Sequence, residues 1–547
     1  MIRDLKKLAR SEFDVLIIGG GISGAAIAYQ AARAGYHVAI VDKNDFGHAT
    51  SANSLKILHG GLRYLQHLNF PRMRHSISAR REIMAFAPHL VRPLACLMPT
   101  YGHGLRGKEV MRCALLLNDI ISLDRNRGLP PHLHLPAGYT ISKKDCQNLL
   151  PGISLQNLTG GSVWHDALAV NTERLVLEFL HAASNHGAIA ANYLEVRNIE
   201  KKSKFHFEVK VNDSLTDRSS TLQAKIIINA SGPWLQTLYD RSGIADGTEQ
   251  HWALALNLIV KKQLTSQYAI GIEGSKDYQD QDAFLNRGKR LYFLVPFQGH
   301  TMIGTDYVRS KADPGHLSVT AQQINKILCD FNAIYHSAAL CYEDVTFFHV
   351  GLLPLASNPE NQSQSLQLEK NSQIIDHNQD GLDGVISIKG VKYTTAPQVA
   401  QEVLKRIKRK IHPNDKHPPS KDFAKKGVTA PEQHVPENFS HLRKQYGSRA
   451  GAIYRYYHDT GEQLQPRGLE GSLSEAEIRY FIEQEMACTL ADIVFRRSDL
   501  GAVCHPGIPR LRRIAESMAR ILNWNSQRMR QELEVVRQRY APLSIAE

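Results

Sequence analysis

Short apolar runs that are separated by glycine turns and amphipathic stretches predict a mixed α/β chain. Residues 13–18 form an apolar run typical of a buried strand, and they lead directly into the glycine-rich residues 19–24. A helical pattern follows over residues 25–35, and a second apolar run at residues 36–41 ends at Asp42. This order of strand, glycine turn, helix and strand predicts a βαβ unit at the start of the chain.

Gly19, Gly21 and Gly24 have the spacing of a dinucleotide-binding turn. The first glycine permits a tight turn, the second lets the backbone approach a pyrophosphate, and the third lets the helix pack close to the strand. Free N–H groups at the helix start attract phosphates. Asp42 lies 18 residues after Gly24, where a ribose-binding carboxylate is expected. The pattern predicts a bound dinucleotide, and an ordinary βαβ turn is the alternative.

The segment after this unit favours FAD over NAD. Residues 48–56 are rich in small hydroxyl side chains, and they lead into the sequence LHGGLRYL at residues 58–65. A plain NAD-binding domain would continue with alternating strands and helices. A long polar loop can instead bond a pyrophosphate and bring residues to an isoalloxazine ring. A surface loop with a glycine turn is the alternative.

Two later segments are predicted to return to the same domain. Residues 224–228 form an apolar strand that ends in NASGPW at residues 229–234, where small residues allow close approach to a buried cofactor. Residues 384–388 form another strand, which is followed by KGVKYTT at residues 389–395.

A helix is predicted over residues 396–409. Pro397 suits its first turn, and Thr394 or Thr395 is a candidate N-cap. We expect the start of this helix to point at the pyrimidine edge of the flavin, where negative charge develops when the ring is reduced. A helix cap with no cofactor contact is the alternative.

The remaining segments suggest a second sheet and a helical end. Residues 235–377 contain alternating strand patterns, such as 290–295 and 301–304, which predict an antiparallel substrate sheet. Apolar residues recur at helical spacing over 474–495 and 511–535 and are expected in a core, although contact with a second copy in a homodimer stays open. The expected organisation is an FAD-binding domain over residues 1–409, interleaved with substrate segments at about 70–160 and 235–377, then a linker at 410–438 and a helical domain at 439–547.

Composition and charge narrow the function classes. The chain has 547 residues, enough for two or three domains, and a net charge of +13 that favours anionic ligands or acidic lipid surfaces. It shows no nucleic-acid-binding module, so no nucleic-acid partner is expected. Seven cysteines without a CxxC pair are typical of reduced thiols, and no spacing predicts a metal site.

The compartment predicted from the sequence is the cytoplasm or the inner face of a membrane. Residues 1–12 are charged and lack the apolar region of a secretory signal, and no run approaches the about 20 apolar residues that span a bilayer. Arg106, Lys108 and Arg112 lie next to the apolar run 113–117, and this segment either sits on an anionic membrane or packs on its own domain as an ordinary amphipathic helix.

With these motifs together, the chain resembles the FAD-dependent glycerol-3-phosphate dehydrogenases, a group within the D-amino-acid-oxidase-like flavoproteins. The resemblance covers roughly the whole chain, and its most specific parts are residues 58–65, 229–234, 302–305 and 389–395, with 477–480 and 492–497 near the end. It implies an α/β fold with a Rossmann-type FAD-binding domain, an antiparallel β substrate domain and a C-terminal helical domain.

The resemblance also implies an activity and its site residues. A small, polar and anionic alcohol lies over the flavin, its C2 hydride passes to a flavin nitrogen, a base removes the hydroxyl proton, and electrons leave to quinone at a peripheral membrane site. The implied catalytic residues are Arg63, Tyr64 and Lys392, and substrate binding adds Asn257 and Lys370. The implied FAD-binding residues are Gly19, Gly21, Ile22, Ser23, Gly24, Asp42, Lys43, Thr50, Ser51, Ser54, Lys56, His59, Gly60, Gly61, Val196, Ala230, Gly232, Trp234, Gly390, Lys392, Tyr393 and Thr394.

Several substrate-facing positions depart from the family pattern. The family usually has an arginine where this chain has Leu353, a histidine where it has Asn257, and a further arginine that aligns only loosely with Lys370. The family's Gly-Thr-Thr-Asp is Gly-Thr-Asp-Tyr at residues 304–307. These changes leave two alternatives open: an FAD-dependent oxidase or dehydrogenase of a different small hydroxy or amino acid, and a flavin-binding regulator with impaired catalysis.

Overall fold

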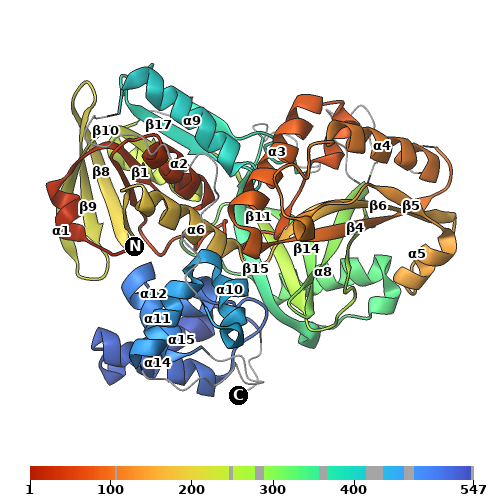
Figure 1. Cartoon of the computed structure of the whole chain (residues 1–547). Helices are drawn as coiled ribbons and strands as arrows, with labels where there is room; N and C mark the ends of the chain where they lie inside the picture. Colours follow the sequence, from red (N-terminus) through yellow and green to blue (C-terminus); the bar gives the residue numbers. More distant parts are fainter. Residues whose placement is uncertain are drawn as a thin grey trace.

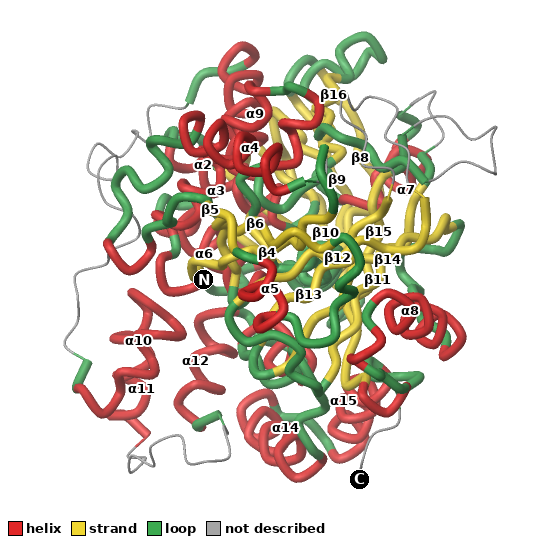
Figure 2. Tube along the Cα trace, turned by 90° about the vertical axis from the view of Figure 1, so that its right-hand side faces the viewer, coloured by secondary structure: helices red, strands yellow, loops and turns green. Residues whose placement is uncertain are grey.

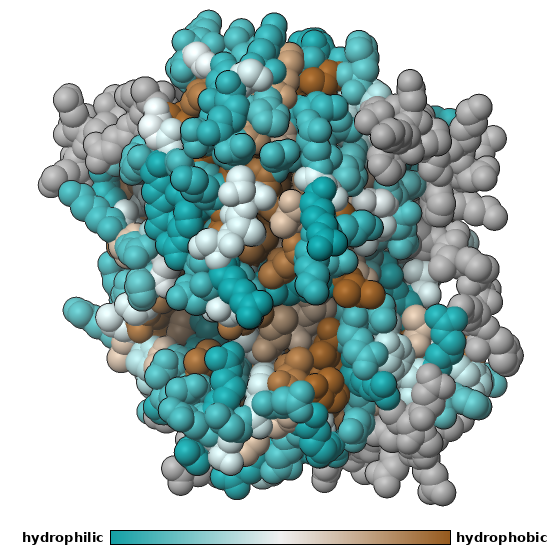
Figure 3. Space-filling view, turned by 90° about the vertical axis from the view of Figure 1, so that its left-hand side faces the viewer, coloured by the Kyte–Doolittle hydropathy of each residue, from teal (hydrophilic) through white to brown (hydrophobic). Residues whose placement is uncertain are grey.

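The computed structural model describes residues 1–104, 107–244, 250–277, 289–356, 366–413, 435–460 and 473–543. Figure 1 shows two sheets with their helices side by side and a group of C-terminal helices beneath the first sheet and the nearest edge of the second. In Figure 2 the strands occupy the middle of the molecule, with α9 (Ala396–Lys410) at one end and α14 (Ile508–Leu522) at the other. The face that carries β8 (Leu194–Ser203) and β9 (His206–Asp213) is mostly hydrophilic, and hydrophobic side chains gather near its middle (Figure 3).

The first sheet is the predicted nucleotide-binding sheet. Its strands follow the order β16-β17-β10-β1-β2-β7, parallel from β17 to β7, with a β8–β9 hairpin extending β10. Its members are β1 (Glu12–Ile18), β2 (Val38–Val41), β7 (Ile189–Ala191), β8 (Leu194–Ser203), β9 (His206–Asp213), β10 (Arg218–Asn229), β16 (Gln373–Asp376) and β17 (Val385–Lys389).

Strand β1 is apolar throughout because both of its faces are covered. Val15 and Ile17 pack in one core with α2 (Ile22–Arg33), α6 (Thr172–Asn185) and α9. Leu16 and Ile18 point to the other side and pack with β8, β9 and α7 (Leu235–Ser242), and α1 (Leu5–Arg10) contributes Leu8 to that core. Strands buried on both faces are expected in a parallel sheet, and they place the carboxyl ends of β1 and β10 at one edge.

The second sheet is largely antiparallel. Its order is β15-β11-β14-β13-β12-β4-β6-β3, with β5 paired to β6 and one parallel pair, β12 with β4. Helix α8 (Ala321–Ile334) packs on it through Ile324 and Phe331, while α3 (Phe70–Phe86) and α4 (Lys108–Ile121) lie on its other side (Figure 1). The strands are β3 (Ile57–Leu58), β4 (Val91–Tyr101), β5 (Tyr139–Ile141), β6 (Leu158–Ala169), β11 (Trp252–Val260), β12 (Tyr268–Asp277), β13 (Lys289–Phe297), β14 (His300–Ser310) and β15 (Val345–Pro354), and α5 (Lys143–Leu149) precedes β6.

The C-terminal region is helical, and its apolar stripe is core. Leu511, Ile514 and Met518 of α14 are buried among the neighbouring helices. The other members are α10 (Ser440–Tyr446), α11 (Ala450–Thr460), α12 (Glu475–Glu485), α13 (Leu490–Asp492), a π-helical turn (Ile493–Arg497) and α15 (Ser526–Gln538). The pattern at 511–535 is two helices rather than one, because Asn523 adopts a left-handed conformation and Asn525 caps the second helix.

The structure confirms the α/β fold class and corrects some local predictions. Residues 373–376, which the sequence assigned to the substrate segment, form β16 and pair with β17 in the first sheet. Thr395 occupies the N-cap of α9, but its hydroxyl donates to the Lys392 carbonyl instead of capping the helix. One N–H that such a cap would bind is missing, because Pro397 has none. Residues 414–434 of the predicted linker lie outside the described residues.

Candidate active site and cofactor cavity

A cavity of about 1310 Å³ brings the three predicted segments together. Its volume exceeds the about 300–1,000 Å³ usual for a small-ligand pocket, so it has room for a dinucleotide and a substrate. Of the predicted site residues only Gly24 and Gly60 do not line it. The structure thus places residues from positions 19 to 394 around one space, while their individual roles stay predictions.

The glycine turn lines this cavity through Gly19 and Gly21. Gly19 has a φ of +104°, and a Cβ there would lie 2.4 Å from the Ala230 carbonyl oxygen, so the turn and the end of β10 need a glycine to approach. Asp42 accepts hydrogen bonds from the backbone N–H of Gly20 at 2.7 Å and of Asn44 at 2.9 Å. Burial raises the pKa of the Asp42 carboxyl, although His48 and these N–H groups oppose the shift. The predicted ribose-binding carboxylate is therefore held in place by the turn itself.

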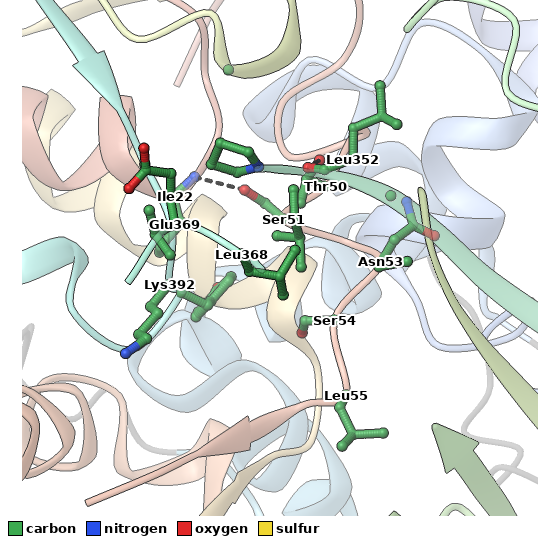
Figure 4. Close-up of a pocket in the computed structure, with 18 of the residues that line it drawn as sticks. Ile22, Thr50, Ser51, Asn53, Ser54, Leu55, Leu352, Leu368, Glu369 and Lys392 are labelled. Carbon is green, nitrogen blue, oxygen red and sulfur yellow. Dashed lines mark hydrogen bonds between the residues drawn. The ribbon is translucent and has the colours of Figure 1, made fainter. Parts of the chain in front are cut away.

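The polar loop after β2 is fixed against the start of α2. Ile22 N–H donates to Ser51 Oγ at 3.0 Å, the bond drawn in Figure 4, and Thr50 Oγ1 donates to the Leu352 carbonyl at 3.1 Å. In the same view Lys392 lies apart from Ser54, at the other side of the residues drawn. Small hydroxyl side chains thus link α2 to β15 and leave the loop facing the cavity.

Lys56 and Lys43 line the cavity in different ways. The Lys56 ammonium lies 3.1 Å from Glu173 Oε2 and donates to Thr172 Oγ1 at 2.6 Å, so this cation is already neutralised by the protein. Lys43 Nζ lies 3.9 Å from the centroid of the Trp234 ring, and burial lowers the pKa of Lys43. Trp234 and Lys43 form one wall near Asp42.

The HGG part of the LHGGLRYL motif is held by a buried carboxylate. Asp166 Oδ1 accepts from the Gly60 N–H at 2.6 Å and from Arg80 Nη1 at 2.5 Å, and Asp166 Oδ2 accepts from Trp164 Nε1 at 2.9 Å. His59 precedes Gly60 in this motif and lines the cavity. Burial lowers the pKa of His59 to about 4, and the nearby cation Lys392 adds to the shift. His59 is accordingly neutral at physiological pH.

Lys392 and Tyr64 contact each other at the wall of the cavity. Lys392 Nζ donates a hydrogen bond to the Tyr64 hydroxyl and lies 4.5 Å from the ring centroid. Burial lowers the pKa of Lys392 to about 7, and the cations Arg72 and Arg63 add to the shift. A lysine with such a pKa is partly neutral at pH 7, so it can accept a proton.

The substrate sheet supplies a mostly neutral wall. Asn257 is buried, and its Oδ1 accepts from Thr305 Oγ1 at 2.7 Å. Leu353 faces the cavity from β15, so the departure noted in the sequence is an apolar side chain on the cavity wall. Lys370 lines the cavity and is half-buried, whereas Arg63 is exposed.

Sequence reasoning missed several residues that line this cavity. Arg72 and Lys326 add positive charge, Asn53 belongs to the polar loop, and Met111 comes from α4. A signal for Arg72 was present, because Asn69 and Pro71 mark a helix start directly after the LHGGLRYL motif.

Comparison with known proteins agrees with this architecture. A family model described as "FAD dependent oxidoreductase" matches residues 14–404, and one described as "C-terminal domain of alpha-glycerophosphate oxidase" matches residues 393–529. The chain is 27% identical to a glycerol-3-phosphate dehydrogenase of Synechocystis sp., over 97% of each chain. It is also 27% identical to the mitochondrial glycerol-3-phosphate dehydrogenase of Homo sapiens, over 96% of this chain and 73% of that protein.

A solved structure shows the same fold. The glycerol-3-phosphate dehydrogenase of Bacillus halodurans, complexed with FAD, superposes with a TM-score of 0.73 over 99% of this chain and 98% of that one, at 24% identity. The first family model alone spans well over half of the chain, and its cofactor is the one that the glycine turn and the polar loop predicted. This chain therefore belongs to the family of FAD-dependent oxidoreductases.

Proposed function

We propose that the protein oxidises the secondary alcohol of glycerol-3-phosphate or a close analogue. The observation that carries this proposal is the Lys392–Tyr64 pair, in which a lysine with a pKa of about 7 faces the same cavity as the glycine turn. Support comes from the relatives named glycerol-3-phosphate dehydrogenase, which match this chain over nearly its whole length.

The cavity has residues suited to hold FAD. The N–H groups at the start of α2 and the hydroxyl of Ser51 would face the pyrophosphate, and Asp42 would face the ribose. The start of α9, next to Thr394, would face the flavin, which it can favour in the reduced form. When bound, FAD supplies the acceptor for the hydride that leaves the substrate C–H bond.

Lys392 would take the second hydrogen of the alcohol as a proton. The neutral amine accepts the proton of the hydroxyl group while the C–H hydride leaves, so the alcohol becomes a ketone and Lys392 becomes an ammonium. Tyr64 holds the amine in place through its hydroxyl. The half-buried position of Lys392 keeps its pKa low enough for this step near neutral pH.

The two alternative functions make different predictions for the bound flavin. Both alternatives rest on Leu353 and Asn257, which line the cavity where the resembling family has an arginine and a histidine. Purified holoprotein should be mixed anaerobically with glycerol-3-phosphate, glycerol, a hydroxy acid and an amino acid while flavin absorbance is followed. Bleaching by glycerol-3-phosphate at the lowest concentration supports the proposal. Bleaching by an acid alone favours the other substrate class, and lasting yellow colour with every compound favours the regulator.

Quinone is the electron acceptor that we propose, and α4 is the element that supports it. Val110, Met111 and Ala114 of this helix line the cavity. On its outer side Leu116, Ile120 and the following Leu123 are 57%, 65% and 81% exposed. One helix therefore separates the cavity from an exposed apolar surface, as a site for a lipid-soluble acceptor would need.

The same surface leads us to propose peripheral attachment to the inner face of a membrane. None of the helices among the described residues is long and apolar enough to cross a bilayer. The outer side of α4 can enter the headgroup region, with Lys108 and Arg112 close by, whereas Arg106 lies outside the described residues. Replacing Leu116 and Ile120 together by serine should abolish co-flotation with anionic vesicles and slow reduction of a short-chain quinone, while anaerobic flavin bleaching stays unchanged. Equal flotation of variant and wild type would contradict this attachment.

A homodimer stays a prediction.

A further inference from the structure

Arg72 is a cation at the reacting end of the cavity that no motif assigned. It lies in the first turn of α3, with its guanidinium carbon 4.5 Å from the centroid of the Tyr64 ring. Lys392 Nζ lies at the same distance from that centroid. Arg72 lines the cavity and is half-buried. Two cations from distant parts of the chain therefore approach the same aromatic ring.

The start of α3 fixes this position. Asn69 caps the helix by accepting from the Arg72 N–H at 3.1 Å, and Pro71 sets the first turn. The backbone of Arg72 is thus anchored, and its side chain reaches the cavity from a rigid element rather than from a loop.

The other arginines of α3 are already paired. Arg74 and Arg81 each lie 2.5 Å from Asp124, and Arg80 lies 2.5 Å from Asp166. Arg72 makes no ion pair within the described part of the chain, where its guanidinium contact is the Tyr64 ring. A positive charge that faces a cavity without a carboxylate partner favours an anionic ligand there.

Recognition of a substrate phosphate group requires a cation in this cavity. Arginine is suited to phosphate because its planar fork can donate two parallel hydrogen bonds. The β15 position where the resembling family carries an arginine presents Leu353 to this cavity, and leucine cannot bind an anion. Arg72 reaches the same cavity from α3, which comes much earlier in the sequence than β15.

We propose that Arg72 recognises the phosphate group of the substrate and so takes over the role of the arginine that is missing at Leu353. This inference rests on the proposed function. It makes Arg72 a specificity-determining residue: the enzyme prefers a phosphomonoester of a small alcohol to the uncharged alcohol because of a helix-borne cation beside Tyr64. Loss of a charge-assisted contact to an anion weakens binding by roughly ten- to a hundredfold.

The test compares Arg72→Met with Arg74→Met in the holoprotein. Arg74 lies on the same helix and pairs with Asp124, so it is the matched control. In steady-state assays Arg72→Met should raise the KM for glycerol-3-phosphate roughly ten- to a hundredfold, with kcat changed only a few-fold. Arg72→Lys should restore part of the affinity, and Arg74→Met should leave KM unchanged. An unaltered KM in Arg72→Met overturns the inference.

The pH profile of kcat/KM distinguishes an effect of the Arg72 charge on the site from a merely structural effect of the substitution. Lys392 is faced by Arg63, Arg72, Tyr64 and His59, and the two arginines repel its positive form. Removing the Arg72 charge should raise the pKa of Lys392 and shift the acid limb of kcat/KM to higher pH. Arg74→Met should show the wild-type profile.

Binding of inorganic phosphate separates this inference from the proposed function. Phosphate should perturb the flavin spectrum of the wild-type holoprotein and should bind roughly ten- to a hundredfold more weakly to Arg72→Met. If wild type binds phosphate through Arg72 but glycerol-3-phosphate never bleaches the flavin, the proposed substrate is wrong and the anion site stands. If both proteins bind phosphate equally, the anion site at Arg72 is wrong. Should Arg72→Met fail to fold, Arg72→Gln and Arg72→Lys carry the same comparison.

Discussion

Asp45 and Arg497 form a fully buried ion pair between the cofactor domain and the C-terminal region. Arg497 Nη1 lies 2.5 Å from Asp45 Oδ2, and its Nη2 lies 2.9 Å from Oδ1, with neither side chain exposed to solvent. Asp45 follows the predicted ribose-binding Asp42 by three residues, and Arg496 reaches the same carboxylate. The π-helical turn of the C-terminal region therefore anchors the loop after β2, which lines the cavity.

Arg497→Met should weaken both the fold and the binding of FAD. Breaking one partner of a buried ion pair costs about 3–5 kcal/mol, and the remaining Arg496 should keep the loss toward the lower value. The freed loop should raise the Kd for FAD roughly tenfold, measured by titrating apoprotein with FAD. The exposed Arg520–Glu475 pair supplies the control, because Arg520→Met should change neither the Tm nor the Kd. A folded Arg497→Met protein with wild-type FAD affinity would show that the ion pair is irrelevant to the cofactor site.

Leu353→Arg should improve the use of glycerol-3-phosphate. Leu353 faces the cavity, so an arginine there adds a second cation for the phosphate group. The KM should fall about tenfold if one charge-assisted contact forms. Leu353→Met, which keeps the wall apolar, is the control. No gain from the arginine variant would mean that the phosphate does not approach β15.

Arg63→Ala should weaken substrate binding and leave FAD in place. Arg63 lines the cavity but is exposed, so water screens its charge and its contribution is smaller than that of a buried cation. We expect a KM for glycerol-3-phosphate that is a few-fold higher, and an unchanged flavin content, measured from the ratio of flavin to protein absorbance. Loss of flavin would place Arg63 at the cofactor instead of the substrate.

The geometry of the glycine turn could be predicted from local sequence because each requirement is local. Steric limits within one turn require glycine at positions 19 and 24, and Asp42 lies at a spacing that the βαβ unit imposes. The end of β10 and the start of α9 were predicted for the same reason, since apolar runs and turn residues identify them. The antiparallel character of the second sheet followed from its alternating pattern.

Contacts between distant segments could not be predicted. The Asp45–Arg497 pair joins residues 452 positions apart, and no local pattern shows which buried charges will meet. Arg72 follows a recognised motif, but only the packing of η1 (Leu62–His67) against α3 places its side chain over Tyr64. The strand at 373–376 was assigned to the wrong sheet because nothing in the sequence of a short edge strand shows which sheet it joins.

The rate of anaerobic flavin reduction by glycerol-3-phosphate tests the proposed reaction most directly. It should be measured by stopped flow between pH 5 and pH 9 for wild type and Lys392→Met. Because the neutral amine accepts the proton, the wild-type rate should rise as pH passes through about 7. It should be slower and independent of pH in Lys392→Met, by roughly a hundred- to ten-thousandfold. Lys405→Met, on the exposed side of α9, should behave as wild type. A wild-type flavin that glycerol-3-phosphate does not reduce would contradict the proposed substrate, and a Lys392→Met rate equal to that of wild type would contradict the proposed role of Lys392.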